Sequence, residues 1–178
     1  MTDISLSASG LVAVSPKVFQ SLRDRVGAQA LQEAGYAAGE TTYAAFERWL
    51  PVHAGVDDPR ELAAPRLAEV LTRFFSSLGW GSLEVSPLGE AAFALDSLNW
   101  AEAQPGAGLQ FPGCYFTAGL AADFVSRLAD AAFAVMEVEC RSRGDARCRW
   151  LVGAPETLTT LYQHMAQGAD YLSVLGAG

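Results

Sequence analysis

The part of the sequence that most restricts the fold is a pair of short apolar segments around a polar turn. The stretch "AAFAVMEVEC", residues 131–140, alternates apolar and polar side chains as a half-buried strand does. "RSRGDAR", residues 141–147, contains the Gly-Asp pair of a turn, and "CRWLVGA", residues 148–154, is apolar again. Together these segments predict an antiparallel β-hairpin. Cys140 then ends one strand and Cys148 begins the next, so the two thiols can lie opposite each other.

The remaining segments predict helices and a second pair of strands. Ser15 and Pro16 are a typical helix start, and Gly35 is expected to end that helix. Pro51 is expected to end the next helix, and Pro65 either kinks the third or marks its start. The predicted helices are residues 16–34, 37–52, 57–79, 114–129 and 155–172, and the further strands are residues 81–88 and 90–97. This order predicts an α+β fold with a twisted antiparallel sheet packed against helices.

Composition and charge restrict the class of protein. The 178-residue chain is 51% hydrophobic and 18% charged, so we expect one globular domain, residues 1–178, with a helical part at 1–78 and the sheet and hairpin at 79–178. Its formal net charge of −8 disfavours nucleic acid or an anionic membrane as a partner. The sequence contains no basic leader and no apolar run long enough to span a bilayer. We therefore expect a cytoplasmic protein, whose thiols stay reduced.

The three cysteines admit three interpretations. A disulfide is disfavoured in the cytoplasm, and three thiols cannot all pair within one chain. A thiolate pair at a hairpin is half of a zinc site, and Glu137 can add a carboxylate if the strand ends or bulges near Val138. Cys114 lies at a predicted helix start, which favours its thiolate form and makes it a fourth candidate ligand. Alternatively, Cys114, Cys140 and Cys148 are buried as small hydrophobic residues.

The segment that contains these cysteines resembles the core of the 4-vinyl reductase domain family. The shared pattern is a cysteine, an aromatic pair, a glycine-rich helix, Glu-x-x-Cys, Gly-Asp, a cysteine and an aromatic residue. Here these positions are Cys114, Tyr115, Phe116, Gly119, Glu137, Cys140, Gly144, Asp145, Cys148 and Trp150. "EAGYAAGE" at 33–40 and "SLGWG" at 77–81 extend the resemblance over most of the chain. The family includes small hydrocarbon-binding proteins and is related to the sensory domain of aromatic-responsive bacterial activators and to the transport-particle (TRAPP) subunit fold.

The resemblance implies a metal site and a ligand pocket. In the aromatic-sensing members the motif cysteines and glutamate hold zinc, which implies a closed structural zinc site with no open position for catalysis. Its ligands here would be Cys114, Glu137, Cys140 and Cys148. Family members bind apolar or aromatic molecules between the sheet and the helices. The candidate ligand-binding residues are Phe74, Phe75, Trp80, Phe93, Trp100, Phe111, Tyr115, Phe116 and Phe133, of which Trp100 and Tyr115 are favoured.

We therefore expect a non-catalytic domain that binds or senses an apolar, hydrocarbon-like or aromatic small molecule. Phenol sensors hold the phenol hydroxyl with a histidine, and neither His53 nor His164 matches it, which disfavours phenol. The alternatives are an enzyme or accessory protein of tetrapyrrole (bacteriochlorophyll) metabolism and a TRAPP-like scaffold subunit. The sequence shows no phosphate-binding glycine loop and no Ser-His-Asp signature. Related folds dimerise through N-terminal helices, so we expect a homodimer with helix 16–34 at its interface.

Overall fold

Two antiparallel hairpins join into one four-stranded sheet. The computed structural model describes residues 10–176. The strand order is β1-β2-β4-β3, so the two hairpins meet where β2 pairs with β4. The strands are β1 (Glu84–Leu88), β2 (Ala92–Ser97), β3 (Ala134–Glu139) and β4 (Cys148–Gly153). The predicted α+β fold with an antiparallel sheet packed against helices is confirmed.

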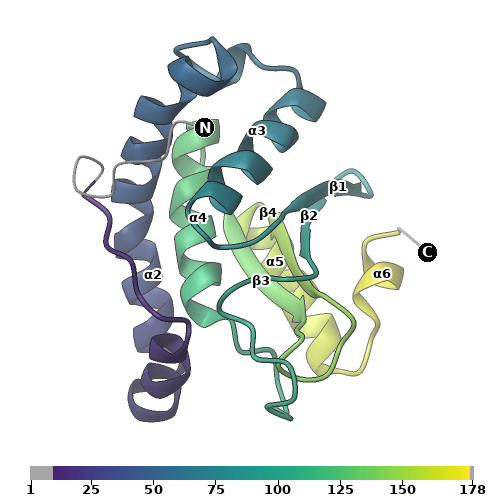
Figure 1. Ribbon diagram of the computed structural model, residues 1–178. Coiled ribbons are helices and arrows are strands. Elements are labelled where there is room, and N and C mark those ends of the chain that lie inside the picture. The colour runs from purple at the N-terminus through teal and green to yellow at the C-terminus, as the bar shows by residue number, and fades with distance from the viewer. Residues whose placement is uncertain (1–9, 177–178) are drawn as a thin grey trace.

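Helices cover both faces of this sheet (Figure 1). The helices are α2 (Lys17–Ala54), α3 (Ala64–Ser77), α4 (Tyr115–Ala129), α5 (Pro155–Ala166) and the short α6 (Tyr171–Val174). Helix α4 packs between α2 and the sheet, while α5 and α6 lie on the opposite face. Alternate residues of β4 therefore enter two different cores: Trp150 and Val152 pack with α4, and Leu151 packs with α5.

The first helix does not end at Gly35, as the sequence predicted, but continues to Ala54. Gly35 packs against α4 so closely that a Cβ atom there would lie 2.0 Å from the Phe116 carbonyl oxygen. On α4, a Cβ atom at Gly119 would lie 1.9 Å from the Gln32 carbonyl oxygen. These glycines therefore serve close helix packing rather than helix termination, and they fix the start of α4 against α2.

The other helix boundaries follow from backbone conformation. Helix α2 is interrupted at Gly27, where φ is 81° and ψ is 174°. Pro51 lies inside α2 and does not end it. The helix ends after Ala54, where Gly55 adopts the left-handed conformation and donates its N–H to the Pro51 carbonyl oxygen. Pro65 marks the start of α3, one of the two predicted alternatives, and residues 59–61 form a separate 3-10 turn. The predicted closing helix 155–172 is divided into α5 and α6.

None of the helices among residues 10–176 is long and apolar enough to cross a membrane.

Candidate metal centre and ligand cavity

A β-bulge brings the Glu-x-x-Cys motif to one side of its strand. In a regular strand, residues 137 and 140 would face opposite sides of the sheet. The register between β3 and β4 shifts between Glu137 and Glu139, which leaves Val138 as the extra residue. The bulge expected near Val138 is thus present. Beyond it, the Asp145 carboxylate accepts a hydrogen bond from the Cys140 backbone N–H at 2.6 Å and holds the turn.

The four predicted metal ligands converge in one buried cluster. The ligand atoms of Cys114, Glu137, Cys140 and Cys148 all lie within 4.8 Å of one another. The Cys114 Sγ atom lies 3.8 Å from that of Cys140 and 4.0 Å from that of Cys148. Two sulfur ligands of a tetrahedral zinc ion would be about 3.8 Å apart, given Zn–S bonds of about 2.3 Å. The sulfur spacing therefore fits a zinc ion without rearrangement.

The cluster connects three elements of the fold. Cys114 is the N-cap residue of α4, and its backbone N–H donates to the Glu137 Oε2 atom at 2.8 Å. Glu137 lies in β3, and Cys148 begins β4. All three cysteines are free and fully buried. A bound cation would therefore tie the start of α4 to the hairpin.

The electrostatics of the cluster favour a cation. Burial and the neighbouring Cys140 thiolate raise the pKa of Glu137 to about 9. Hydrogen bonds with the other two thiols, together with burial, raise the pKa of Cys114. The Glu137 Oε1 atom is buried and has no hydrogen-bond partner among the described residues. Buried acidic groups this close cannot all ionise unless a positive charge compensates them, so this group of three cysteines and one glutamate can hold a metal ion.

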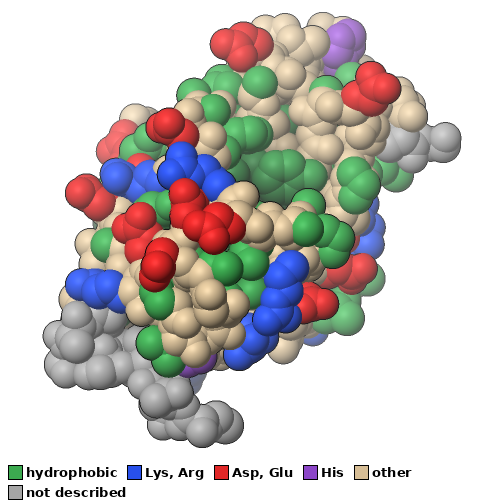
Figure 2. Space-filling view, turned by 90° about the horizontal axis from the view of Figure 1, so that it is seen from above, with side chains coloured by type: hydrophobic (Ala, Val, Ile, Leu, Met, Phe, Trp, Pro, Cys, Tyr) green, Lys and Arg blue, Asp and Glu red, His purple; other side chains and the backbone are tan. Residues whose placement is uncertain are grey.

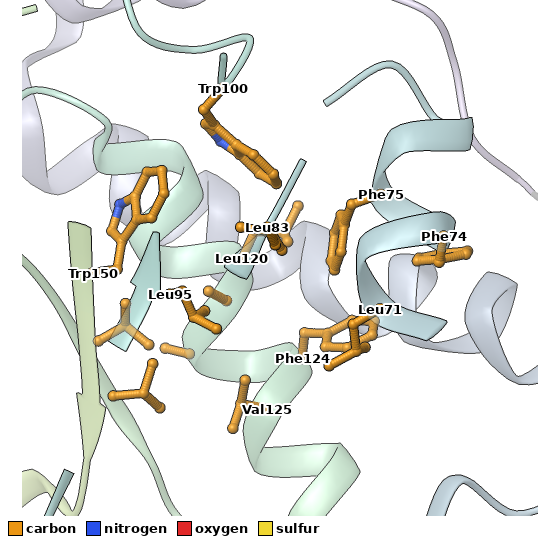
Figure 3. Packing of buried hydrophobic residues seen from close by; sticks show 14 of the residues in the cluster. Leu71, Phe74, Phe75, Leu83, Leu95, Trp100, Leu120, Phe124, Val125 and Trp150 are labelled. Atoms are coloured by element: carbon orange, nitrogen blue, oxygen red, sulfur yellow. The ribbon is translucent and has the colours of Figure 1, made fainter. Parts of the chain in front are cut away.

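A cavity of about 560 Å³ lies between α3, α4 and the sheet. Figure 3 shows how side chains from these elements surround the space, with Trp100 and Trp150 at one end and Val125 toward the other. None of its lining side chains in the described part of the chain carries a charge. The lining residues are Ala64, Pro65, Leu67, Ala68, Leu71, Phe75, Leu83, Val85, Pro87, Phe93, Leu95, Trp100, Thr117, Leu120, Ala121, Phe124, Val125, Leu128 and Trp150.

The cavity has an open end and a deep end. Ala64, Pro65 and Pro87, at the start of α3 and on the edge strand β1, are exposed. Trp100 and Trp150 are only 3% and 1% exposed. Figure 2 shows hydrophobic side chains gathered in a hollow on the face seen from above α3. A ligand would therefore enter between α3 and β1 and reach the two indoles last.

The deep end contains a short chain of hydrogen bonds. The Trp100 Nε1–H donates to the Thr117 Oγ1 atom at 2.7 Å, and the Thr117 hydroxyl donates to the Glu102 Oε2 atom at 2.6 Å. Glu102 also accepts the backbone N–H groups of Phe116 and Thr117, so it caps the first turn of α4. Burial raises the pKa of Glu102 to about 7 despite these bonds. The Trp150 Nε1–H, in contrast, is buried and has no partner among the described residues.

Three of the nine predicted ligand-binding residues line this cavity: Phe75, Phe93 and Trp100. Trp80 and Phe116 do not line it. They lie behind Trp100, because the Trp80 ring stacks on Trp100 at 5.4 Å and on Phe116 at 6.0 Å. Trp80 and Phe116 therefore pack behind the part of the cavity wall that Trp100 forms.

The other four predicted residues also lie away from the lining. Phe74 points to the Phe46 side of α3, because neighbouring residues on a helix point about 100° apart. Phe133 packs against Phe93 at 6.3 Å. Tyr115 is half-buried at the start of α4, and Phe111 is 64% exposed in the preceding loop.

Many of the residues that line the cavity were not among the predicted ligand-binding residues. Helix α4 contributes a stripe at three- and four-residue spacing, and Trp150 lies two positions after Cys148, on the same face of β4. These helix and strand spacings are present in the sequence and could have identified the lining residues. Glu102 gave no such signal, because its role depends on a loop that folds back onto α4. The stripe residues are Thr117, Leu120, Ala121, Phe124, Val125 and Leu128.

The fold of this chain is also found in solved structures of other proteins. The fold is similar to that of the phenol-responsive sensory domain of the transcription activator PoxR, solved with phenol (TM-score 0.54, 14% identity, 79% of this chain and 73% of that chain). It is also similar to a trafficking protein particle complex subunit 3 from Naegleria fowleri, covalently bound to palmitic acid (TM-score 0.56, 16% identity, 83% and 90%). At these identities the likeness shows a shared fold.

The match to a family model covers the segment that contains the three cysteines. Residues 101–154 match the family model of the 4-vinyl reductase domain, which confirms the resemblance to that family. A vinyl-4-reductase family protein from Methanocaldococcus jannaschii is a further structural match (TM-score 0.47, 22% identity, 85% of this chain and 82% of that chain). No curated protein matches the sequence.

Proposed function

We propose that this chain is a non-catalytic domain that binds an uncharged, apolar small molecule in the cavity between α3, α4 and the sheet. The cavity carries the proposal: its volume of about 560 Å³ lies within the range of ligand pockets, about 300–1,000 Å³. Because no lining side chain among the described residues is charged, a charged group inside would be buried without a partner. The cavity therefore selects against charged ligands.

The size and the polar atoms of the cavity narrow the ligand class. An apolar cavity of about 150 Å³ holds one benzene molecule, so this cavity has room for a considerably larger hydrocarbon. His53 stacks on Trp49 and, like His164, is not a lining residue in the described chain. None of the lining positions in the described chain is a cysteine, so the cavity offers no thiol for a covalent bond to a ligand. The PoxR domain solved with phenol and the TRAPP subunit bound to palmitic acid support an aromatic or aliphatic ligand.

We further propose that Cys114, Glu137, Cys140 and Cys148 hold a structural zinc ion. The 3.8 and 4.0 Å sulfur separations and the unpaired Glu137 Oε1 atom support it. When bound, the ion would supply a four-ligand cross-link without an open position for a reacting water. Metal analysis of protein purified without added zinc should find about one equivalent. Well under one equivalent, with no thiolate absorption after cobalt addition, would count against the site.

The first experiment on the ligand is native mass spectrometry of the purified protein, followed by the same run under denaturing conditions. An organic adduct lost on denaturation would give the mass of a retained ligand. A titration with the neutral fluorescent probe 1-aminoanthracene tests the cavity directly. The substitution Ala121→Phe fills it from α4, and Ala129→Phe places the same ring at an exposed position of that helix.

We expect Ala121→Phe to weaken probe binding at least about tenfold, while Ala129→Phe leaves it unchanged. Equal probe affinity in all three proteins would show that the probe binds elsewhere. Absence of both a retained ligand and probe binding would favour a scaffold role instead.

We also propose a cytoplasmic homodimer that pairs through the N-terminal segment of α2. Val18, Leu22 and Val26 recur every four residues and are 40%, 38% and 48% exposed, which leaves an apolar stripe on this segment. Sedimentation at micromolar concentration should show a dimer, and Leu22→Glu should shift it to monomer. A wild-type monomer under these conditions would contradict this arrangement.

A further inference from the structure

We infer that Trp150 couples the metal site to the cavity, so that metal and ligand each strengthen the binding of the other. This inference rests on the proposed function. The deep wall of the cavity is the part formed by Trp100 and Trp150. Trp150 is assigned the role of a positioning residue, which acts on this wall and on the Glu137 carboxylate.

Trp150 lies between the two sites. It follows Cys148 by two residues in β4, so both side chains face α4. Its ring lines the cavity and meets the Trp100 ring nearly edge-on at 5.5 Å. Its direct partner across the β3–β4 ladder is the metal-ligand candidate Glu137. The same indole therefore borders the ligand space and the metal cluster.

This cross-strand pair carries an unpaired donor and an unpaired acceptor. Both the Trp150 Nε1 atom and the Glu137 Oε1 atom are buried without a partner among the described residues. Figure 3 shows the Trp150 nitrogen on the side of the ring that faces away from Trp100. Directly opposed residues have Cβ atoms about 4.5–5.5 Å apart, within reach of such side chains. The Nε1 and Oε1 atoms do not hydrogen-bond to each other in this structure. Carboxylates that bind metals are themselves oriented by hydrogen bonds, and a shift of the Glu137 carboxylate on binding a cation would let the Trp150 N–H supply one.

The second indole of the deep wall is also attached to the metal cluster. Trp100 donates to Thr117, which lies in the first turn of α4, three residues after Cys114. A cation that fixes Cys114 and Cys148 therefore fixes the supports of both indoles. Without the cation, the start of α4 and the hairpin lose this link, and a ligand must order the wall as it binds.

Coupling of this kind is reciprocal: if the metal tightens ligand binding, the ligand tightens metal binding by the same factor. The experiment starts from the metal-loaded full-length chain. The dissociation constant of 1-aminoanthracene is measured first. Zinc affinity is then measured by competition with a chromophoric chelator, with and without saturating probe. We expect the probe to tighten zinc binding in the wild-type chain at least about fivefold.

Two tryptophan variants locate the coupling. Trp150→Phe keeps an aromatic ring in the wall and removes the N–H. The probe affinity of this variant is measured first as its own baseline, and the coupling should fall to about twofold or less, the remainder being the link through Thr117 and α4. Trp49→Phe is the matched control. It removes another buried, unpaired indole N–H, but Trp49 is neither a cavity-lining residue nor a candidate metal ligand. This variant should keep the wild-type coupling.

The outcomes separate the two proposals. If loaded wild-type protein does not bind the probe, the proposed function fails, and the inference with it. If the probe binds but leaves zinc affinity unchanged, the inference is overturned and the proposed function stands. Full coupling in Trp150→Phe overturns the role of Trp150. If that variant does not fold, the wild-type indole N–H resonances decide: zinc loading should shift that of Trp150 downfield and leave that of Trp49 in place, and an unmoved Trp150 resonance overturns its role.

Discussion

The two faces of the sheet differ in how fully their polar groups are paired and how fully their space is filled. Alternate residues of the same strands contribute to each face. On the α5 face, Arg149 forms a bidentate ion pair with Asp96 at 2.7 and 2.6 Å. Tyr171 accepts a hydrogen bond from Arg149 and donates one to Glu139. On the α4 face the Trp150 Nε1 atom and the Glu137 Oε1 atom have no partner among residues 10–176, and a cavity of about 560 Å³ remains.

If the α4 face binds a ligand and a metal ion, as proposed, the difference between the two faces is one between binding and stabilising the fold. A face that only stabilises the fold can fill its space and pair its polar groups, whereas a binding face must keep space and donors for its ligands. We therefore expect substitutions on the α5 face to lower stability and leave binding unchanged. On the α4 face, substitutions in the group of candidate metal ligands should change metal binding and stability together. Substitutions in the cavity should be able to change one of ligand affinity and stability without the other.

The largest effect is expected from Cys140→Ser, which removes one of the four proposed metal ligands. The remaining ligands would bind zinc far more weakly, and the free energy of unfolding should fall by more than about 4 kcal/mol, as for the loss of a structural metal. Metal content and urea denaturation of the same samples measure this. Arg141→Ala, the neighbouring turn residue, should retain one equivalent of zinc. Full stability of Cys140→Ser would mean that the cluster is merely a group of buried thiols.

On the opposite face, Asp96→Ala should cost about 3–4 kcal/mol of unfolding free energy, because it leaves the buried Arg149 guanidinium without its main partner. Probe affinity should not change. The double variant Asp96→Leu/Arg149→Met replaces both charges and should recover most of the loss. A large change in probe binding in either variant would show that the two faces are not independent.

A smaller effect is expected from the titration of Glu102. Burial raises its pKa from 4.5 to about 7, so the folded state disfavours the ionised form. This contribution to stability is fully present below about pH 4.5 and is lost as the pH rises through about 7, by up to about 3 kcal/mol. Glu102→Gln should flatten this part of the stability profile. The exposed Glu69→Gln should not, and a wild-type profile that is flat between pH 5 and 7 would contradict the assignment.

The fold was largely predictable because its signals are local. The alternation in β3 and the Gly-Asp turn define the hairpin within 24 residues, 131–154. One error came from a glycine whose role depends on a distant partner. Gly35 was interpreted as a helix end, but it is where α2 contacts the Phe116 carbonyl. Such a contact between residues far apart in sequence leaves no local pattern.

The candidate site was predictable to a different extent in its two halves. The group of four candidate metal ligands follows from the motif, because a hairpin and one helix start are enough to bring these residues together. Predicting the cavity lining requires knowing which aromatic side chains face the empty space. Phe74 and Phe75 are adjacent, yet only Phe75 lines the cavity. Three-dimensional packing decides this choice, and composition gives no guide to it.

The smallest predicted effect compares two leucines on the central strands. Leu151 in β4 is fully buried against α5, whereas Leu95 in β2 lines the cavity. Replacing a buried leucine by alanine costs about 2–5 kcal/mol, and the cost rises with the contacts that are lost. Leu95 already borders empty space, so Leu95→Ala should cost about 1–2 kcal/mol less than Leu151→Ala.

Urea denaturation of ligand-free protein measures this difference, provided that the two variants unfold with the same denaturant dependence. Adding saturating probe should stabilise both variants, which shows that the cavity remains competent when the opposite face is weakened. Equal losses in the ligand-free variants would mean that Leu95 is as closely packed as Leu151. The space beside it would then be filled or collapsed in solution, and the contrast between a closed face and a binding face would not hold.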